Sequence, residues 1–156
     1  MKIGIIVFSR TGHTLSVAEK LRDTLAAAGH EVRLERVTAE GGDPGKGGAV
    51  RLTGTPAVEP YDACVFASPV EGFSLAQPMK LYLKQIGSLK GKKTGFFVTR
   101  HLTPKWMGGS RSIAQMENAC REKGAEIGKF GMITWKDEEL RERQTTETVA
   151  LLSGMF

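Results

Sequence analysis

The first 28 residues place the strongest constraint on the fold, because an apolar run passes through one short turn into an amphipathic segment. Residues 3–8 are Ile-Gly-Ile-Ile-Val-Phe, which is typical of a strand buried on both faces. Residues 13–28 place apolar side chains at helical spacing and stop before Gly29, a residue type favoured just after a helix. A buried strand followed at once by a helix indicates the βα unit of a parallel sheet.

The same alternation continues along the chain. We predict further strands at 31–37, 61–68, 94–99 and 126–135, and further helices at 76–86, at 110–123 and from about 137. Five strands alternating with helices predict an α/β fold, a doubly wound five-stranded parallel sheet with helices on both faces. The order 2-1-3-4-5 is the commoner choice for five such strands. The length suits a single domain over residues 1–156.

Residues 40–57 depart from this alternation. They are rich in glycine and contain Pro44 and Pro56, so they do not support a good helix. They also fail as a Walker-type nucleotide loop, because Lys46 is followed by Gly47 and no strand leads directly into the segment. We predict a long mobile loop here, with a lid over a ligand as the alternative.

The turn after the first strand, Ser9-Arg10-Thr11-Gly12-His13-Thr14, has the composition of an anion site. Ser9, Thr11 and Thr14 supply hydroxyl donors, and Gly12 allows a ligand to approach the backbone closely. The N–H groups at the start of the following helix lack intrahelical partners, and the helix dipole adds partial positive charge there. Because the turn contains no lysine, we expect a phosphate monoester held mainly by hydrogen bonds. The alternative is an ordinary βα turn with a polar cap.

This turn resembles the phosphate loop of the flavodoxin family, T/S-x-T-G-x-T, and matches all of its fixed positions. Ser68 to Ser74 resembles the family's second flavin loop, and residues 94–125 resemble its fourth strand, third flavin loop and following helix. The resemblance implies a flavodoxin-like fold and an FMN cofactor bound where these loops meet, at the carboxyl ends of the strands. FMN is expected rather than FAD because the chain offers no obvious second site for an adenosine half.

The residues that the resemblance implies as FMN contacts fall in three loops. No catalytic or metal-binding residue is assigned. The contacts are Ser9, Arg10, Thr11, Gly12, His13 and Thr14; Ser68, Pro69, Val70, Glu71, Gly72 and Phe73; and Thr99, Arg100, His101, Trp106 and Gly108. Phe73 and Trp106 are the candidates for stacking on the flavin ring, an interaction that contributes about 0.5–1.5 kcal/mol beyond burial. Alternatively, Phe73 belongs to the core and Trp106 covers the sheet edge.

The third loop departs from the family pattern, which often has an acid and a tyrosine near the ring. This chain has Thr99-Arg100-His101-Leu102 instead. A positive charge at Arg100, His101 or Lys105 would stabilise the negatively charged reduced flavin and raise its reduction potential. The alternative is that Arg100 and His101 point to solvent, and His101 is also a candidate acid–base group. His13 is expected at the rim of the phosphate loop, where its cationic form would favour an anion.

The charge distribution is uneven. The formal net charge is +5, and residues 72–116 contain no acidic residue at all. The basic residues in that segment are Lys80, Lys84, Lys90, Lys92, Lys93, Arg100, Lys105 and Arg111. A solvated basic face is the simplest interpretation, and attraction of NADPH phosphates or an anionic substrate is the alternative. No nucleic-acid-binding motif accompanies the charge, so no nucleic-acid partner is expected.

The two cysteines, Cys64 and Cys120, fall in an apolar strand and on the apolar side of a helix. Buried, reduced thiols are therefore expected, which suits a cytoplasmic location. No apolar run is long enough for a signal peptide core or a membrane span.

These observations favour an FMN-binding, flavodoxin-like electron-transfer protein. An FMN-dependent NAD(P)H or quinone oxidoreductase on the same scaffold is the first alternative, and a non-redox binding module is the second. The expected partner is a redox protein, NAD(P)H or a quinone.

Overall fold

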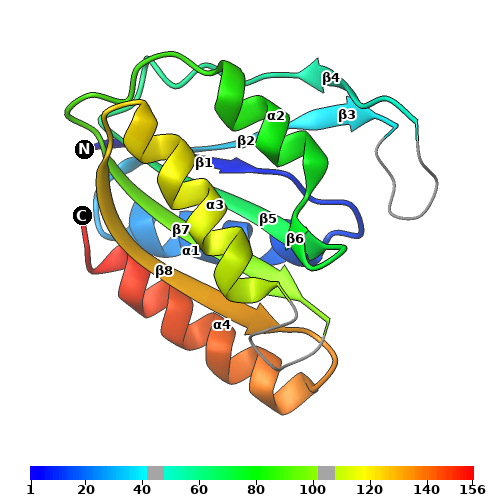
Figure 1. Ribbon diagram of the computed structural model, residues 1–156. Coiled ribbons are helices and arrows are strands. Elements are labelled where there is room, and N and C mark those ends of the chain that lie inside the picture. The colour runs from blue at the N-terminus through cyan, green and yellow to red at the C-terminus, as the bar shows by residue number, and fades with distance from the viewer. Residues whose placement is uncertain (42–47, 102–107) are drawn as a thin grey trace.

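The computed structural model describes residues 1–41, 48–101 and 108–156. Its main sheet has five parallel strands in the order β2-β1-β5-β7-β8, which is the predicted order 2-1-3-4-5 in the numbering of Figure 1. The predicted α/β fold is thus confirmed. The strands are β1 (Lys2–Val7), β2 (Glu31–Arg36), β5 (Ala63–Glu71), β7 (Lys93–Arg100) and β8 (Glu126–Thr134).

In the described residues, two helices cover each face of the sheet. Each pair of helices packs against the sheet over a separate apolar core. Helices α1 (His13–Ala27) and α4 (Glu138–Ser153) pack against one another on one face, over a cluster that includes Ile5, Leu21 and Phe97. Helices α2 (Gln77–Gln85) and α3 (Gly109–Glu122) lie side by side on the opposite face (Figure 1). Their cluster includes Phe66, Met79 and Met116, all fully buried. The central strands are therefore buried on both faces, as their continuous apolar runs predict.

Residues 40–57 are more ordered than a long loop in the part that the structure describes. Strand β4 (Arg51–Gly54) pairs antiparallel with β3 (Thr38–Glu40) in a separate two-stranded sheet beside α2. The structure thus corrects the prediction for this part: Arg51, Leu52 and Thr53 alternate exposed and half-buried side chains, and Leu52 packs against the main core. The alternative of a lid, made for residues 40–57, stays a prediction, and residues 42–47 of that segment lie outside the described residues.

The segment after the third predicted strand is a β-hairpin rather than a loop. Strand β5 continues to Glu71, and β6 (Ser74–Leu75) folds back on it in antiparallel pairing. Gly72 and Phe73 form the two-residue connection with φ of 58° and 63°. A two-residue hairpin turn of this kind needs a positive φ at both central residues. Of the two, only Gly72 is a residue type that favours a positive φ. The hairpin turns the chain back towards α2.

The cysteines and the helices agree with the sequence-based expectations where the structure describes them. Cys64 and Cys120 are both buried free thiols, and burial raises the pKa of Cys64 to about 12. Helix α4 begins after Asp137, whose carboxylate accepts from the N–H of Leu140 at 3.1 Å. Of the helices described, none has both the length and the apolar character that crossing a bilayer requires.

Candidate functional site

The loops after β1, β5 and β7 meet at the carboxyl ends of the strands. In the first loop, Gly12 has φ of 90° and sits directly before α1. The Ser9 hydroxyl oxygen accepts from the N–H groups of Gly12 at 3.2 Å and Leu15 at 3.3 Å, so Ser9 holds the turn in shape. The first turn of α1 contains no acidic residue. The partial positive charge of this helix end is therefore not neutralised from within the helix.

Several donors of the first loop have no hydrogen-bond acceptor among the described residues. Thr11 is exposed, and its hydroxyl forms no hydrogen bond with the residues that the structure describes. The same holds, within those residues, for the N–H groups of His13 and Thr14, which begin the helix. The loop thus presents hydroxyl and amide donors at a helix N-terminus, the arrangement that favours a phosphate group.

Thr14 joins the first loop to the third. Its hydroxyl lies 2.7 Å from that of Thr99, at the end of β7, and both side chains are buried. Either oxygen is able to donate in this pair, so the other keeps a proton to offer elsewhere. The sequence indicated a role for both residues but gave no sign that they contact one another.

Arg10 joins the first loop to the second. Its guanidinium donates to both carboxylate oxygens of Glu71, at 2.7 Å and 3.0 Å, and lies over the Phe8 ring. Because the ion pair between Arg10 and Glu71 is bidentate and half-buried, it fixes the distance between the two loops. Arg36 adds a support that the sequence analysis missed: it donates to the Ser9 carbonyl at 3.2 Å from the neighbouring strand β2.

The second and third loops are in direct contact at Gly108. A Cβ at this position would lie 2.4 Å from the Phe73 carbonyl carbon and 2.6 Å from its Cα, so only glycine fits. Gln115 of α3 then binds the hairpin, accepting from the Ser74 hydroxyl at 3.0 Å and the Leu75 N–H at 2.9 Å. Phe73 itself is 56% exposed, which excludes the alternative that it belongs to the core.

Arg100 neither points to solvent nor lies free in the third loop. It is only 7% exposed, and its Nε donates to the Thr134 hydroxyl at 3.2 Å on β8. Burial lowers the pKa of this guanidinium, and no acid contacts it within the described residues. It borders a cavity of about 250 Å³ between β8 and α4, with Met132, Gln144 and Glu147. The alternative that Arg100 points to solvent is therefore wrong, because its side chain is buried and directed towards β8. Its contact with FMN stays a prediction.

His13 also differs from the expectation. Its ring stacks on Trp135 with centroids 4.2 Å apart, and Arg141 lies over the same indole. Burial lowers the pKa of His13, and the positive charges of Arg141 and His101 lower it further. The neutral imidazole is thus favoured, and the predicted cationic contribution to an anion site is not supported. The sequence gave no signal for Trp135, because its contact with His13 spans most of the chain.

We expect His13 to make stability depend on pH. Its folded-state pKa lies below the ordinary 6.5, so the unfolded chain takes up this proton more readily. The stability that the neutral His13 contributes is fully present above pH 6.5, and it is lost as the pH falls through the folded-state pKa of His13. Between pH 7 and pH 5 the urea midpoint should fall more for the wild type than for His13→Phe, which keeps a ring on Trp135. An equal fall in both proteins would contradict this assignment.

The other residues predicted to contact FMN lie in the second and third loops. Ser68 is buried, and its hydroxyl donates to the Pro69 carbonyl at 3.0 Å, while Pro69 and Val70 are half-buried. His101 is exposed at the end of the third loop's described part. Trp106, together with Leu102 and Lys105, lies outside the described residues. The structure therefore brings the first loop, the hairpin, Thr99 and Gly108 together. The Arg100 side chain points away from them, towards β8.

The sheet order and the joined loops define a flavodoxin-like α/β protein, and solved structures show the same fold. A flavodoxin from Streptococcus pneumoniae covers all of this chain and is covered fully, with a TM-score of 0.70 and 18% identity. The oxidised flavodoxin 2 from Bacillus cereus gives 0.65 and 25% identity, with 99% of each chain covered. A flavoprotein from Lactobacillus acidophilus, solved in complex with FMN, gives 0.61 and 17% identity over 92% of this chain and 98% of its own.

The sequence matches no family model and no curated protein. The likeness to flavodoxins is thus one of fold, together with the residues of the first loop.

Proposed function

We propose that this protein binds FMN at the joined loops and transfers electrons through it. The observation that carries the proposal is the set of uncommitted donors on the first loop: the Thr11 hydroxyl and the N–H groups of His13 and Thr14 at the start of α1. They suit a terminal phosphate without a lysine, because hydrogen bonds to a charged acceptor are the strong ones. The three loops are already joined to one another, so the site is organised before a ligand arrives.

The second and third loops suit the flat part of the cofactor. Phe73 presents an exposed aromatic ring from a tight turn, and Gly108 brings the third loop against its backbone. An exposed aromatic side chain beside backbone N–H and C=O groups matches a ring that is apolar on its faces and polar at its edge. Bound FMN would supply the redox chemistry, while this chain would set access to it and its potential.

Titration with FMN tests the proposal directly. We expect uptake of one FMN per chain, with quenched flavin fluorescence and a shifted absorption spectrum. A protein that leaves both signals unchanged in excess FMN would instead be a binding module without redox function. Sustained consumption of NADH or NADPH by the loaded protein alone would make it an oxidoreductase rather than a carrier.

We also expect the reduced flavin to form more easily than in an acidic flavodoxin. Arg100 is a buried positive charge at the end of β7 with no acid in contact within the described residues. Such a charge stabilises a nearby negative charge and raises the reduction potential. Arg100→Gln should therefore lower the potential measured by redox titration, and Arg100→Lys should largely retain it. A potential unaffected by either change would show that Arg100 lies too far from the flavin to matter.

A further inference from the structure

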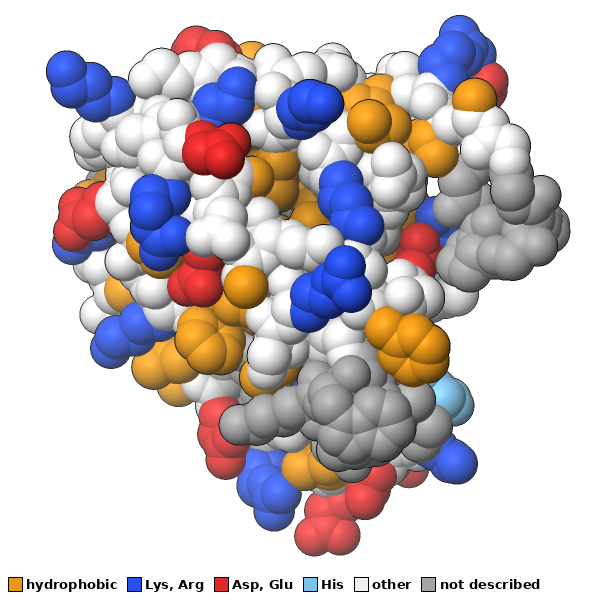
Figure 2. All heavy atoms as spheres, viewed as in Figure 1, with side chains coloured by type: hydrophobic (Ala, Val, Ile, Leu, Met, Phe, Trp, Pro, Cys, Tyr) orange, Lys and Arg blue, Asp and Glu red, His pale blue; other side chains and the backbone are white. Residues whose placement is uncertain are grey.

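Basic side chains gather at the end of the α2–α3 face that lies nearest to the proposed flavin site. Between Gly72 and Met116 the chain contains no Asp or Glu. Figure 2 shows Lys and Arg side chains over this face, with α2 and α3 placed as in Figure 1. The acids of α3, Glu117 and Glu122, follow in its later turns, away from the loop end.

Two of these basic residues lie on the helices that adjoin the hairpin carrying Phe73. Arg111 precedes Gln115 by one helical turn, and Gln115 holds Ser74 and Leu75 through its side-chain oxygen. Lys80 lies in the first turns of α2, which begins directly after the hairpin. Arg111 is exposed, Lys80 is half-buried, and Phe73 is more than half exposed.

These charges are not cancelled by neighbours. Within residues 1–41, 48–101 and 108–156, neither Lys80 nor Arg111 takes part in an ion pair. Glu71, the last acid before the basic stretch, is committed to Arg10. The surface made by Phe73, Lys80 and Arg111, here called the Phe73 face, therefore combines an exposed aromatic ring with uncompensated positive charge.

We propose that the Phe73 face is the docking surface for an acidic redox partner protein, which exchanges electrons with the flavin there. The proposal rests on the proposed FMN-binding function. Complementary charge accelerates association and orients the partner, and an exposed aromatic residue within a charged surround is the common composition of a protein interface. Nucleic acid is the less favoured occupant, because no nucleic-acid-binding motif accompanies the face.

The test compares two haem acceptors that differ in charge but share one prosthetic group: cytochrome c, which is basic, and its succinylated form, which is acidic. The reduced FMN-loaded protein is mixed with each acceptor in a stopped-flow instrument at low and high salt. We expect the acidic acceptor to be reduced faster at low salt and to slow as salt is added, while the basic acceptor shows the opposite dependence.

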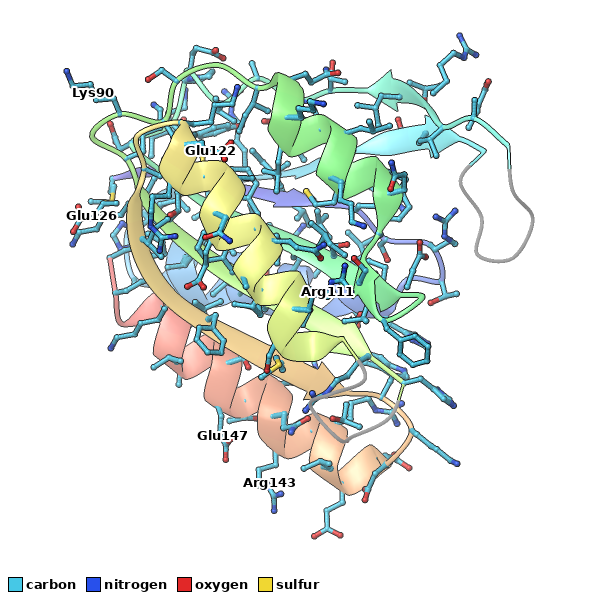
Figure 3. The ribbon with its side chains drawn as sticks, viewed as in Figure 1. Lys90, Arg111, Glu122, Glu126, Arg143 and Glu147 are labelled. Carbon is cyan, nitrogen blue, oxygen red and sulfur yellow. The ribbon has the colours of Figure 1, made fainter. Side chains whose placement is uncertain are left out.

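A matched pair of variants distinguishes an effect of the Phe73 face on the reduction rate from an effect of the protein's net charge. Lys80→Glu/Arg111→Glu changes the Phe73 face, and Lys20→Glu/Arg143→Glu makes the same charge change on α1 and α4. Figure 3 shows Arg111 on α3 and Arg143 on α4, on opposite faces of the sheet. We expect the face variant to slow reduction of the acidic acceptor about tenfold at low salt, within the range known for electrostatic steering. The control variant should change it less than about twofold, because α1 and α4 lie on the opposite face of the sheet from α2 and α3.

Each other outcome overturns the proposal in a distinguishable way. Failure of all proteins to take up FMN overturns the proposed function and this docking surface with it. Normal FMN spectra with equal rates in the two variants overturn only the docking surface. Binding of a single-stranded oligonucleotide or of anionic lipid vesicles that the face variant loses and the control retains would assign the face to that ligand instead.

Discussion

Gly108→Ala is expected to destabilise the protein and to weaken the binding of both FMN and riboflavin. Gly108 has φ of 104°, and an added Cβ would lie 2.4–2.6 Å from backbone atoms of Phe73. The left-handed conformation costs about 1–2 kcal/mol for a residue with a Cβ. Overpacking adds about 1–3 kcal/mol, because the atoms nearest to the added Cβ are main-chain atoms of Phe73 that cannot rotate away. Relief of the clash would separate the second loop from the third, which is where the flavin ring is expected.

Gly29→Ala is the matched control for this prediction. Gly29 has φ of 94° but nothing within 4 Å of an added Cβ, and it follows α1 far from the loops. It should lose only the conformational part of the free energy of unfolding and bind both flavins as the wild type does. Urea unfolding and fluorescence titration measure the two effects. Equal losses in the two variants would show that the contact between Gly108 and Phe73 is unimportant.

Thr11→Ala is expected to weaken FMN about 10- to 100-fold while leaving riboflavin binding unchanged. Only FMN carries the phosphate, and a hydrogen bond to a charged group contributes about 1.5–3 kcal/mol. The exposed Thr11 side chain has no partner in the described protein, so its loss should change the free energy of unfolding by less than about 0.5 kcal/mol.

Thr11→Ser keeps the hydroxyl and should retain most of the FMN affinity. The measurement is the ratio of the dissociation constants for FMN and riboflavin in each variant. If Thr11→Ala weakens both ligands equally, Thr11 is no phosphate ligand, and the assignment of the first loop as a phosphate site loses its main support.

The structure also shows why the hydroxyls of the first loop are not equivalent. Ser9 accepts two backbone N–H groups and shapes the turn, and Thr14 is paired with Thr99. Thr11 forms no such contact within the described residues. The motif names three hydroxyls as candidate donors, yet the contacts give each a different task. Replacing Ser9 or Thr14 would therefore disturb the loops as well as any ligand.

The sequence by itself determined the alternation of strands and helices and the place of the first loop. Buried parallel strands and amphipathic helices have periodicities set by residues that are neighbours in the chain, and the first loop is one continuous stretch. The turn at Gly72 and Phe73 was less visible, because a positive φ at Phe73 has no signature in the residue type. The pairing of β3 with β4 was missed because glycines and prolines around β4 obscured a short strand.

Only the tertiary structure decided which loops hold one another and where the charged side chains point. Arg10 with Glu71, Thr14 with Thr99, and His13 with Trp135 are each more than sixty residues apart in the chain. Arg100 follows the alternation of β7, so it lies on the opposite side of the strand from Thr99 and is directed towards β8. These contacts depend on which strands are neighbours in the sheet and on how closely the helices pack on it. No short stretch of the sequence specifies either of these two features.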